Sequence, residues 1–366
     1  MLATLRRAIP ALALVAIVAC GQGSTSSGAS GAAKPAAPTT AAAPAGGAAP
    51  AAPGGQTSAP AAAAAPVTIR YGQVTVTAMF WGLWAAEAKG FMQAENVTVE
   101  PTVFRVSSDS TRALSSDSVD MAGGTATDSV VLADEQGNAD IIVVSGVLNK
   151  PTYSLITRPE VKTFTDLRGK TLAVSDLKDG STILLQQMLQ MKGVPRTEYD
   201  IIQAGGTPDR YAAVKSGGAA GALLTQPADF KAESEGFNNL GLVSDLIPDY
   251  QFTVNAVRRA WAQQNADGLV RFLRAYAKGC QWLYDPANKD EAIKILSDKL
   301  SSDQESSQKT YDLLITHAQA IPKAGEVNMA GVQKVLDIMG ELDNVPKPVP
   351  PPSKYLDMSY LERARQ

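Results

Sequence analysis

The sequence predicts a two-lobed α/β fold that follows an export signal and a low-complexity segment. Residues 67–366 alternate short β-branched runs with segments of helical periodicity. Two extended stretches rich in β-formers, 153–157 and 251–257, divide these elements into two sets. From residue 265 the chain is helical, which indicates a return to the first set. Two crossings between two rigid lobes predict a hinge with a cleft beside it.

The first segment of the chain has the composition of an export signal followed by a tether. Arg6 and Arg7 precede a short apolar run that ends in small residues before Cys20. This pattern is typical of a secretory signal peptide, and the run is too short to span a bilayer. Residues 21–66 are almost wholly Ala, Pro, Gly, Ser, Thr and Gln. Such a segment has little to bury and predicts a disordered tether.

The elements of the two predicted lobes follow in order along the chain. In the first lobe we expect strands at 67–71, 97–100, 120–123 and 141–144, and helices at 80–91, 111–116 and 128–135. In the second we expect strands at 171–174, 199–202 and 220–224, and helices at 181–192, 208–216 and 227–235. Helices are then expected at 265–284, 287–299, 303–318 and 328–341. Each lobe has the βαβα order that predicts a parallel sheet.

These elements divide the chain into a signal, a tether, two lobes and two crossings. We assign them to 1–19 for the signal peptide, 20–66 for the tether, 67–152 and 258–366 for lobe 1, 158–250 for lobe 2, and 153–157 and 251–257 for the hinge crossings.

Composition excludes several classes of function. The net charge of −3 becomes −5 once Arg6 and Arg7 are removed with the signal, so the mature chain lacks the basic face that nucleic acids require. The chain has one histidine, His317, and two cysteines, so we expect no zinc site and no serine triad. Cys280 follows the helical spacing of neighbouring apolar residues, which predicts a buried and inert thiol.

Several short motifs resemble one family of binding proteins. They are AEAKGF at 86–91, DMAGG at 120–124, DLRGKTLAV at 166–174, RFLRAY at 271–276 and DMSY at 357–360. In this order they resemble the type II periplasmic substrate-binding proteins of ABC importers, in the group that includes nitrate, sulfonate, taurine and thiamine-pyrimidine-precursor binders. The stretch Ile17-Val18-Ala19-Cys20 before Gly21 resembles the lipobox of bacterial lipoproteins, in which the cysteine is acylated.

The resemblance implies an exported solute-binding lipoprotein of the type II periplasmic binding protein fold. We expect it to be anchored through Cys20 on the outer face of the cytoplasmic membrane, or periplasmic, and to deliver a small molecule to an ABC permease. We expect a monomer without cofactor, metal or catalysis. An enzyme on the same fold, of the thiamine-precursor synthesis or small-acid dehydration type, is the alternative, and an extracytoplasmic sensor module is a third possibility.

The candidate ligand residues lie where predicted strands pass into helices. Ligands of open parallel sheets bind beyond the carboxyl ends of the strands, and free N–H groups at helix starts favour anions. Glycine and hydroxyl residues follow several strands, although such residues also form ordinary caps and turns. The indole of Trp81 is a candidate flat wall, and Arg105 a candidate partner for a carboxylate or sulfonate. The predicted contacts are Gln73, Thr75, Thr77, Trp81, Arg105, Gly124, Thr125, Ser175, Gly205 and Thr225.

These residues indicate the charge and chemical class of the ligand. The cleft has few basic residues for an inorganic dianion and no cage for a quaternary amine. The pattern favours a small organic molecule with an aromatic ring or a weak anionic group.

Overall fold

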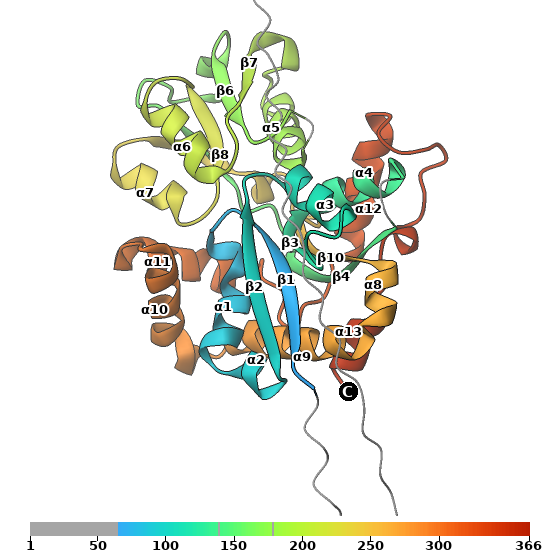
Figure 1. The fold of residues 1–366 in the computed structure, drawn as a ribbon. Coiled ribbons are helices and arrows are strands. Elements are labelled where there is room, and N and C mark those ends of the chain that lie inside the picture. The colour runs from blue at the N-terminus through green and yellow to red at the C-terminus, as the bar shows by residue number, and fades with distance from the viewer. Residues whose placement is uncertain (1–64, 138–139, 178) are drawn as a thin grey trace, which may run out of the picture. The chain divides into compact units, whose positions relative to one another are not determined.

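A computed structural model describes residues 65–137, 140–177 and 179–366, which form two five-stranded sheets with helices packed on them (Figure 1). The predicted signal peptide, Cys20 and the tether up to residue 64 lie outside the described residues. No helix in the described ranges has the length and apolar composition that crossing a membrane requires.

Sheet A carries the first set of elements and has the strand order β2-β1-β3-β10-β4. Its strands are β1 (Val67–Val74), β2 (Val97–Phe104), β3 (Met121–Ala126), β4 (Ile141–Leu148) and β10 (Thr253–Arg258). Strand β1 runs parallel to β2 and β3, whereas β10 is antiparallel to β3 and β4. The helical segments are η1 (Ala78–Phe80), α1 (Trp81–Ala88), α2 (Phe91–Ala94), α3 (Ser107–Ser115) and α4 (Thr127–Glu135).

Sheet B carries the second set and has the strand order β7-β6-β8-β5-β9. Its strands are β5 (Ser154–Thr157), β6 (Thr171–Val174), β7 (Asp200–Gln203), β8 (Gly221–Leu224) and β9 (Asn238–Leu242). Strand β6 is parallel to β7 and β8, and β5 is antiparallel to β8 and β9. The helical segments are η2 (Phe164–Leu167), α5 (Gly180–Met191), η3 (Arg196–Glu198), α6 (Thr207–Lys215), α7 (Ala228–Ser234) and η4 (Val243–Asp245).

The remaining chain is helical and packs mainly on the first set of elements. It contains α8 (Arg259–Gln264), α9 (Ala266–Trp282), η5 (Pro286–Asn288), α10 (Lys289–Leu300), α11 (Gln304–Tyr311), the π-helical turn η6 (Asp312–His317), α12 (Met329–Glu341), η7 (Pro352–Lys354) and α13 (Ser359–Ala364). Helix α9 packs against α1, α2 and α13, and α11 also reaches α7 beside sheet B. Below, lobe 1 is sheet A with its helices and α8–α13, and lobe 2 is sheet B with α5–α7.

The order of strands and helices agrees with the sequence prediction, but the sheets are mixed instead of parallel. The two stretches expected as hinge crossings contain β5 and β10, the strands that run antiparallel within sheets B and A. Extended β-branched segments have backbone groups to pair, so they join the sheets they connect. The chain leaves sheet A after Leu148 and returns to it at Thr253. The hinge role of these segments and the lobe boundaries stay predictions.

The core of lobe 1 contains the unpaired thiol of Cys280. Its side chain is fully buried beside Gly82 of α1, where a Cβ atom would lie 2.5 Å from the sulfur. Burial raises the pKa of this thiol to about 12. The predicted burial of Cys280 is therefore confirmed, and the tight fit of α1 on α9 explains why position 82 is a glycine.

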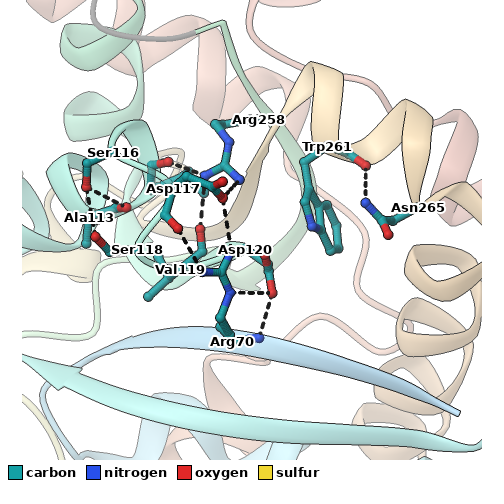
Figure 2. A network of polar contacts seen from close by, with 11 residues as sticks. Arg70, Ala113, Ser116, Asp117, Ser118, Val119, Asp120, Arg258, Trp261 and Asn265 are labelled. Atoms are coloured by element: carbon teal, nitrogen blue, oxygen red, sulfur yellow. Dashed lines mark hydrogen bonds and ion pairs between the residues drawn. The ribbon is translucent and has the colours of Figure 1, made fainter. Parts of the chain in front are cut away.

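One polar cluster secures lobe 1 at the amino ends of its parallel strands (Figure 2). Arg70 of β1 pairs with Asp120 at 2.6 Å and with Asp117 at 2.9 Å. Arg258, at the end of β10, also pairs with Asp117 and donates to the carbonyls of Leu114 and Val119. We call Arg70, Asp117, Asp120 and Arg258 the Arg70–Arg258 cluster. Its charges are mutually neutralised, and it joins the turn after α3 to three strands.

Candidate functional site

A small cavity lies between the two lobes, at the carboxyl ends of the parallel strands. Its volume is about 40 Å³, enough for roughly three water-sized groups. Both lobes contribute to its wall, which is formed by Val74, Thr75, Met79, Arg105, Val106, Ser107, Gly124, Ala126, Tyr153, Ser175, Asp179, Ser181, Gly206, Thr207, Arg210, Thr225, Phe252 and Thr253. This is the place at which open α/β sheets bind ligands.

Arg210 is the charged group that dominates the lobe 2 side of this cavity. It lies one turn into α6 and is only 3% exposed. Its guanidinium donates to the hydroxyls of Ser181 at 3.3 Å and Thr207 at 3.1 Å, and its Nε–H has no partner. No carboxylate forms an ion pair with it among the residues that the structure describes. The guanidinium also lies 5.3 Å from the centre of the Tyr153 ring, and its charge acts on the nearby Asp179. A buried cation without a direct ion pair and with an unpartnered N–H favours an added anion.

Asp179 lies beside Arg210, connected through a serine. It caps α5, accepting from the Thr182 N–H at 3.1 Å and the Ser181 hydroxyl at 2.8 Å, while the Ser175 hydroxyl donates to its other oxygen. Burial raises the pKa of Asp179, and the hydrogen bonds from the two serines oppose the rise. Ser181 thus joins Arg210 to Asp179, and we call these residues with Ser175 and Thr207 the Arg210 cluster.

Helix starts from both lobes converge on the cavity. Ser107 and Thr127 begin α3 and α4 in lobe 1, and Gly180 and Thr207 begin α5 and α6 in lobe 2. The Ser107 hydroxyl accepts from the Ala126 N–H at 3.1 Å. The first N–H groups of a helix lack intrahelical partners and carry partial positive charge, so this end of both sheets suits an anionic group.

The lobes contact each other directly around the cavity. Arg105, after β2, pairs with Asp209 of α6 at 3.0 Å and donates to the Ala204 carbonyl at 3.3 Å. The Ser108 hydroxyl of α3 donates to Asp176, after β6, at 3.2 Å. Beyond this second contact lies a groove of about 640 Å³ between α3, α4 and the start of α5. Ser108 and Asp176 themselves line this groove.

The structure brings five of the ten predicted site residues to the cavity. Thr75, Arg105, Gly124, Ser175 and Thr225 line it. Gln73, Thr77 and Thr125 are buried nearby without lining it, and Gly205 lies against the Arg105 side chain. The Oγ1 atoms of Thr77 and Thr125 have no hydrogen-bond partner in the described part of the chain. Whether any of these residues contacts a ligand stays a prediction.

The expectation that Trp81 forms a wall of the cleft is wrong. Its side chain is fully buried in lobe 1, and its indole N–H donates to the Ala292 carbonyl of α10 at 3.0 Å. The ring packs edge-on against Tyr311 at 5.8 Å. Trp81 begins α1, which is buried on almost every side, so helical spacing does not reveal which side faces the cleft. Tyr153 and Phe252, whose rings meet edge to face with their centres 4.8 Å apart, provide the aromatic surface instead.

Sequence reasoning missed Arg210, Ser107 and Tyr153 as lining residues. Arg210 follows Thr207 by three positions, so a helix beginning at the Gly205-Gly206-Thr207 turn presents both on one face. That spacing was a usable signal. Tyr153 gave none, because its place in the cavity depends on the pairing of β5 with β8.

The chain belongs to the family described as NMT1/THI5 like, whose sequence profile matches residues 77–289. It is also 24% identical over 294 residues to YtlA of Bacillus subtilis (strain 168), named as a binding protein; the match covers 77% of this chain and 85% of YtlA.

Solved structures share the fold of this chain. The periplasmic nitrate-binding protein NrtA from Synechocystis PCC 6803 has a TM-score of 0.70 and 15% identity, over 82% of this chain and 89% of NrtA. A ligand-binding component of an ABC-type import system from Staphylococcus aureus has a TM-score of 0.68 and 15% identity, over 81% and 98%. The alkanesulfonate-binding protein SsuA from Xanthomonas axonopodis pv. citri has a TM-score of 0.65 and 16% identity, over 81% and 99%. The predicted periplasmic binding protein fold is therefore confirmed.

Proposed function

We propose that this protein is an extracytoplasmic solute-binding protein that captures a small organic anion between its lobes and delivers it to an ABC permease. The observation that carries the proposal is the buried guanidinium of Arg210, which has an unpartnered Nε–H and no carboxylate partner among the described residues. A ligand carboxylate or sulfonate supplies the missing charge. Tyr153 and Phe252 offer an apolar surface for the rest of the molecule.

The relatives support the same class of function. NrtA is a nitrate-binding protein, SsuA an alkanesulfonate-binding protein, and the Staphylococcus aureus protein a component of an import system. All three are named as proteins that bind ligands, NrtA is named as periplasmic, and YtlA is named as a binding protein. An ABC permease is therefore the partner that we propose, with the two lobes closing on the ligand as rigid bodies.

We propose binding without catalysis for this chain. The hydroxyls of Ser175 and Ser181 both donate to the Asp179 carboxylate, which also accepts from the Thr182 N–H, so these groups together hold the start of α5. The one histidine of the sequence, His317, lies in η6 and does not line the cavity.

The membrane attachment is a separate part of the proposal. Cys20 is proposed to carry lipid, with residues 21–66 as the tether, on the pattern of small residues before the cysteine. Cys20→Ser should leave the protein unlipidated and move it out of the detergent phase in partitioning. A variant that partitions like the wild type contradicts this assignment.

The ligand proposal is tested by native mass spectrometry of the protein purified under mild conditions. We expect a bound anion in the wild type and in Arg363→Ala, a matched variant at an exposed arginine of α13. We expect none in Arg210→Ala with an unchanged melting temperature. Binding of the same molecule by Arg210→Ala at full affinity contradicts the proposal.

A further inference from the structure

Asp128 is a buried carboxylate of lobe 1 that lies against lobe 2. It is in the first turn of α4, and its side chain is fully buried. Neither carboxylate oxygen has a hydrogen-bond partner within the described residues, and no ion pair there includes it. The nearby N–H groups of Gly180 and Ser129 lower its pKa without reaching hydrogen-bond geometry. The carboxylate is therefore poorly compensated in this arrangement of the lobes.

Gly180 is the residue of lobe 2 that meets this carboxylate. It begins α5, and a Cβ atom there would lie 2.4 Å from Oδ1 of Asp128 and 3.3 Å from the hydroxyl of Tyr250. Its backbone is not left-handed, so its φ angle does not require glycine. Glycine is needed here only because the Asp128 carboxylate approaches the main chain so closely. A Cβ atom at position 180 requires the Asp128 carboxylate or α5 to shift, and we expect α5 to move because the carboxylate is fully buried.

The charged and titratable groups around Asp128 add no compensation. Asp179, from the start of α5, acts on it as a like charge, and Tyr250 approaches from the segment that returns to lobe 1. The pKa of Tyr250 is raised well above its usual range by burial and by both aspartates. Burial, with Asp179 as the second cause, raises the pKa of Asp128 to about 8. The neutral acid is the form that this contact accommodates.

We propose that the contact between Asp128 and Gly180 is a proton-linked latch between the lobes. Closing the lobes transfers one proton from solvent to the Asp128 carboxylate, and opening returns it. The inference rests on the proposed function, since it requires lobes that open and close. It assigns a regulatory role to two residues that need not touch the ligand.

The direction of the pH effect follows from the two protonation states. In the open form the carboxyl is solvated and titrates near its ordinary value of about 4. In the closed form its pKa is about 8, so closure is favoured at low pH and weakens as pH rises between these values. The closed-to-open ratio should fall by up to about tenfold for each pH unit in this window, and change little above it.

The latch is tested by measuring the distance between the lobes in the protein without added ligand. Spin labels are placed on Thr102→Cys in β2 and Thr197→Cys in η3, both exposed, in the full chain carrying Cys20→Ser. Cys280 is fully buried, and mass analysis checks that two labels are attached. Double electron–electron resonance is recorded from pH 5 to pH 10 for each variant.

We expect the wild-type distance to lengthen with rising pH, and Asp128→Asn to stay short throughout. In Gly180→Ala the distance between the labels should be long at every pH. Alanine favours the helix that begins at this position, so a loss of helix would not explain the result. Gly218→Ala is the matched control: its nearest atom lies 3.5 Å away and its φ is not positive, so it should follow the wild type. Melting curves verify that each variant is folded.

Three results overturn the latch: a wild-type distance independent of pH, the wild-type slope in Asp128→Asn, or agreement of Gly180→Ala with Gly218→Ala. If Gly180→Ala does not fold, the slope of Asp128→Asn decides alone. If the latch proposal fails, the solute-binding proposal still stands, because it is tested separately by the bound anion and by Arg210→Ala. If no anion is found, the distances between the spin labels still test the latch.

Discussion

Two arginine–aspartate clusters lie at opposite ends of the strands, and they differ in how completely their charges are paired. In the Arg70–Arg258 cluster each arginine meets a carboxylate directly, and the remaining donors reach main-chain carbonyls (Figure 2). In the Arg210 cluster the guanidinium donates to two hydroxyls and lies over the Tyr153 ring, makes no direct ion pair with a carboxylate of the described residues, and keeps an unpartnered Nε–H. The charges of the Arg70–Arg258 cluster are paired within the cluster, whereas the Arg210 cluster leaves a donor free for a ligand.

The positions of the clusters explain the difference. The Arg70–Arg258 cluster closes the turn after α3 at the amino ends of the parallel strands, where a stable connection is sufficient. The Arg210 cluster lies at the carboxyl ends, where helices of both lobes begin. Arg210 and Thr253, which line the cavity, are among the buried residues that keep a polar atom without a hydrogen-bond partner in the described part of the chain.

The largest expected effect is on ligand binding. Arg210→Ala should weaken binding of the co-purified anion by about 2–5 kcal/mol, because a buried charge pair loses one partner. The melting temperature should not fall, since no ion pair of the described residues is lost. Titration calorimetry beside Arg258→Ala as the control checks this. Equal affinities in the two variants contradict the contrast between the clusters.

The second effect is on stability, and it concerns the Arg70–Arg258 cluster. Arg258→Ala should lower the free energy of unfolding by about 1–3 kcal/mol, because the buried carbonyls of Leu114 and Val119 lose their donor. Ligand affinity should be unchanged. Urea denaturation measures the loss, and Arg363→Ala, at an exposed site, is the comparison. A stability equal to that of the comparison variant means that the cluster does not secure lobe 1.

A smaller effect concerns how stability depends on pH. It involves Asp229, a buried carboxyl whose oxygens all have hydrogen-bond partners. Asp229 of α7 accepts from Ser154 and Gln226, both at 2.7 Å, and burial raises its pKa to about 6. A raised pKa in the folded state means that stability is highest below pH 4 and declines as pH rises towards 6. Asp229→Asn should make this decline shallower, leaving the contribution of Asp128, and thermal melts from pH 4 to pH 7 measure the difference. An unchanged slope shows that Asp229 titrates normally.

The smallest effect is expected at Cys280, an unpaired group that is closed off from solvent. Burial and the raised pKa keep its thiol neutral and inaccessible. A thiol reagent should therefore label it only after denaturant is added, as read by mass spectrometry. Rapid labelling of the native protein contradicts the packing of α9 on α1.

The fold was readable from the sequence because its elements have strong periodicity and clear caps. The alternation up to β8 and the later helices all appear near their expected residues. The antiparallel placement of β5 and β10 was not readable, since an extended run does not reveal its neighbours. The edge strand β9 and the short helices α8 and α13 are too brief or too polar for a periodic signal.

Only half of the predicted site residues line the cavity, because a sequence pattern does not show which neighbours cover a given face. Hydroxyl and glycine residues after strands indicated the right edge of the sheets, and Thr75, Gly124, Ser175 and Thr225 lie there. Helical spacing, however, gives the faces of a helix without saying which one is covered. Trp81 was therefore placed in the cleft although it belongs to the core, and Arg210 was overlooked.

We expect an anionic group of the ligand to complete the pairing of Arg210. This expectation is tested most directly by titrating the wild type and Arg210→Ala with the co-purified acid and with its neutral amide analogue. We expect the wild type to prefer the acid by about a hundredfold or more, and Arg210→Ala to lose this preference. Equal binding of acid and amide by the wild type, or an undiminished preference in the variant, would contradict it.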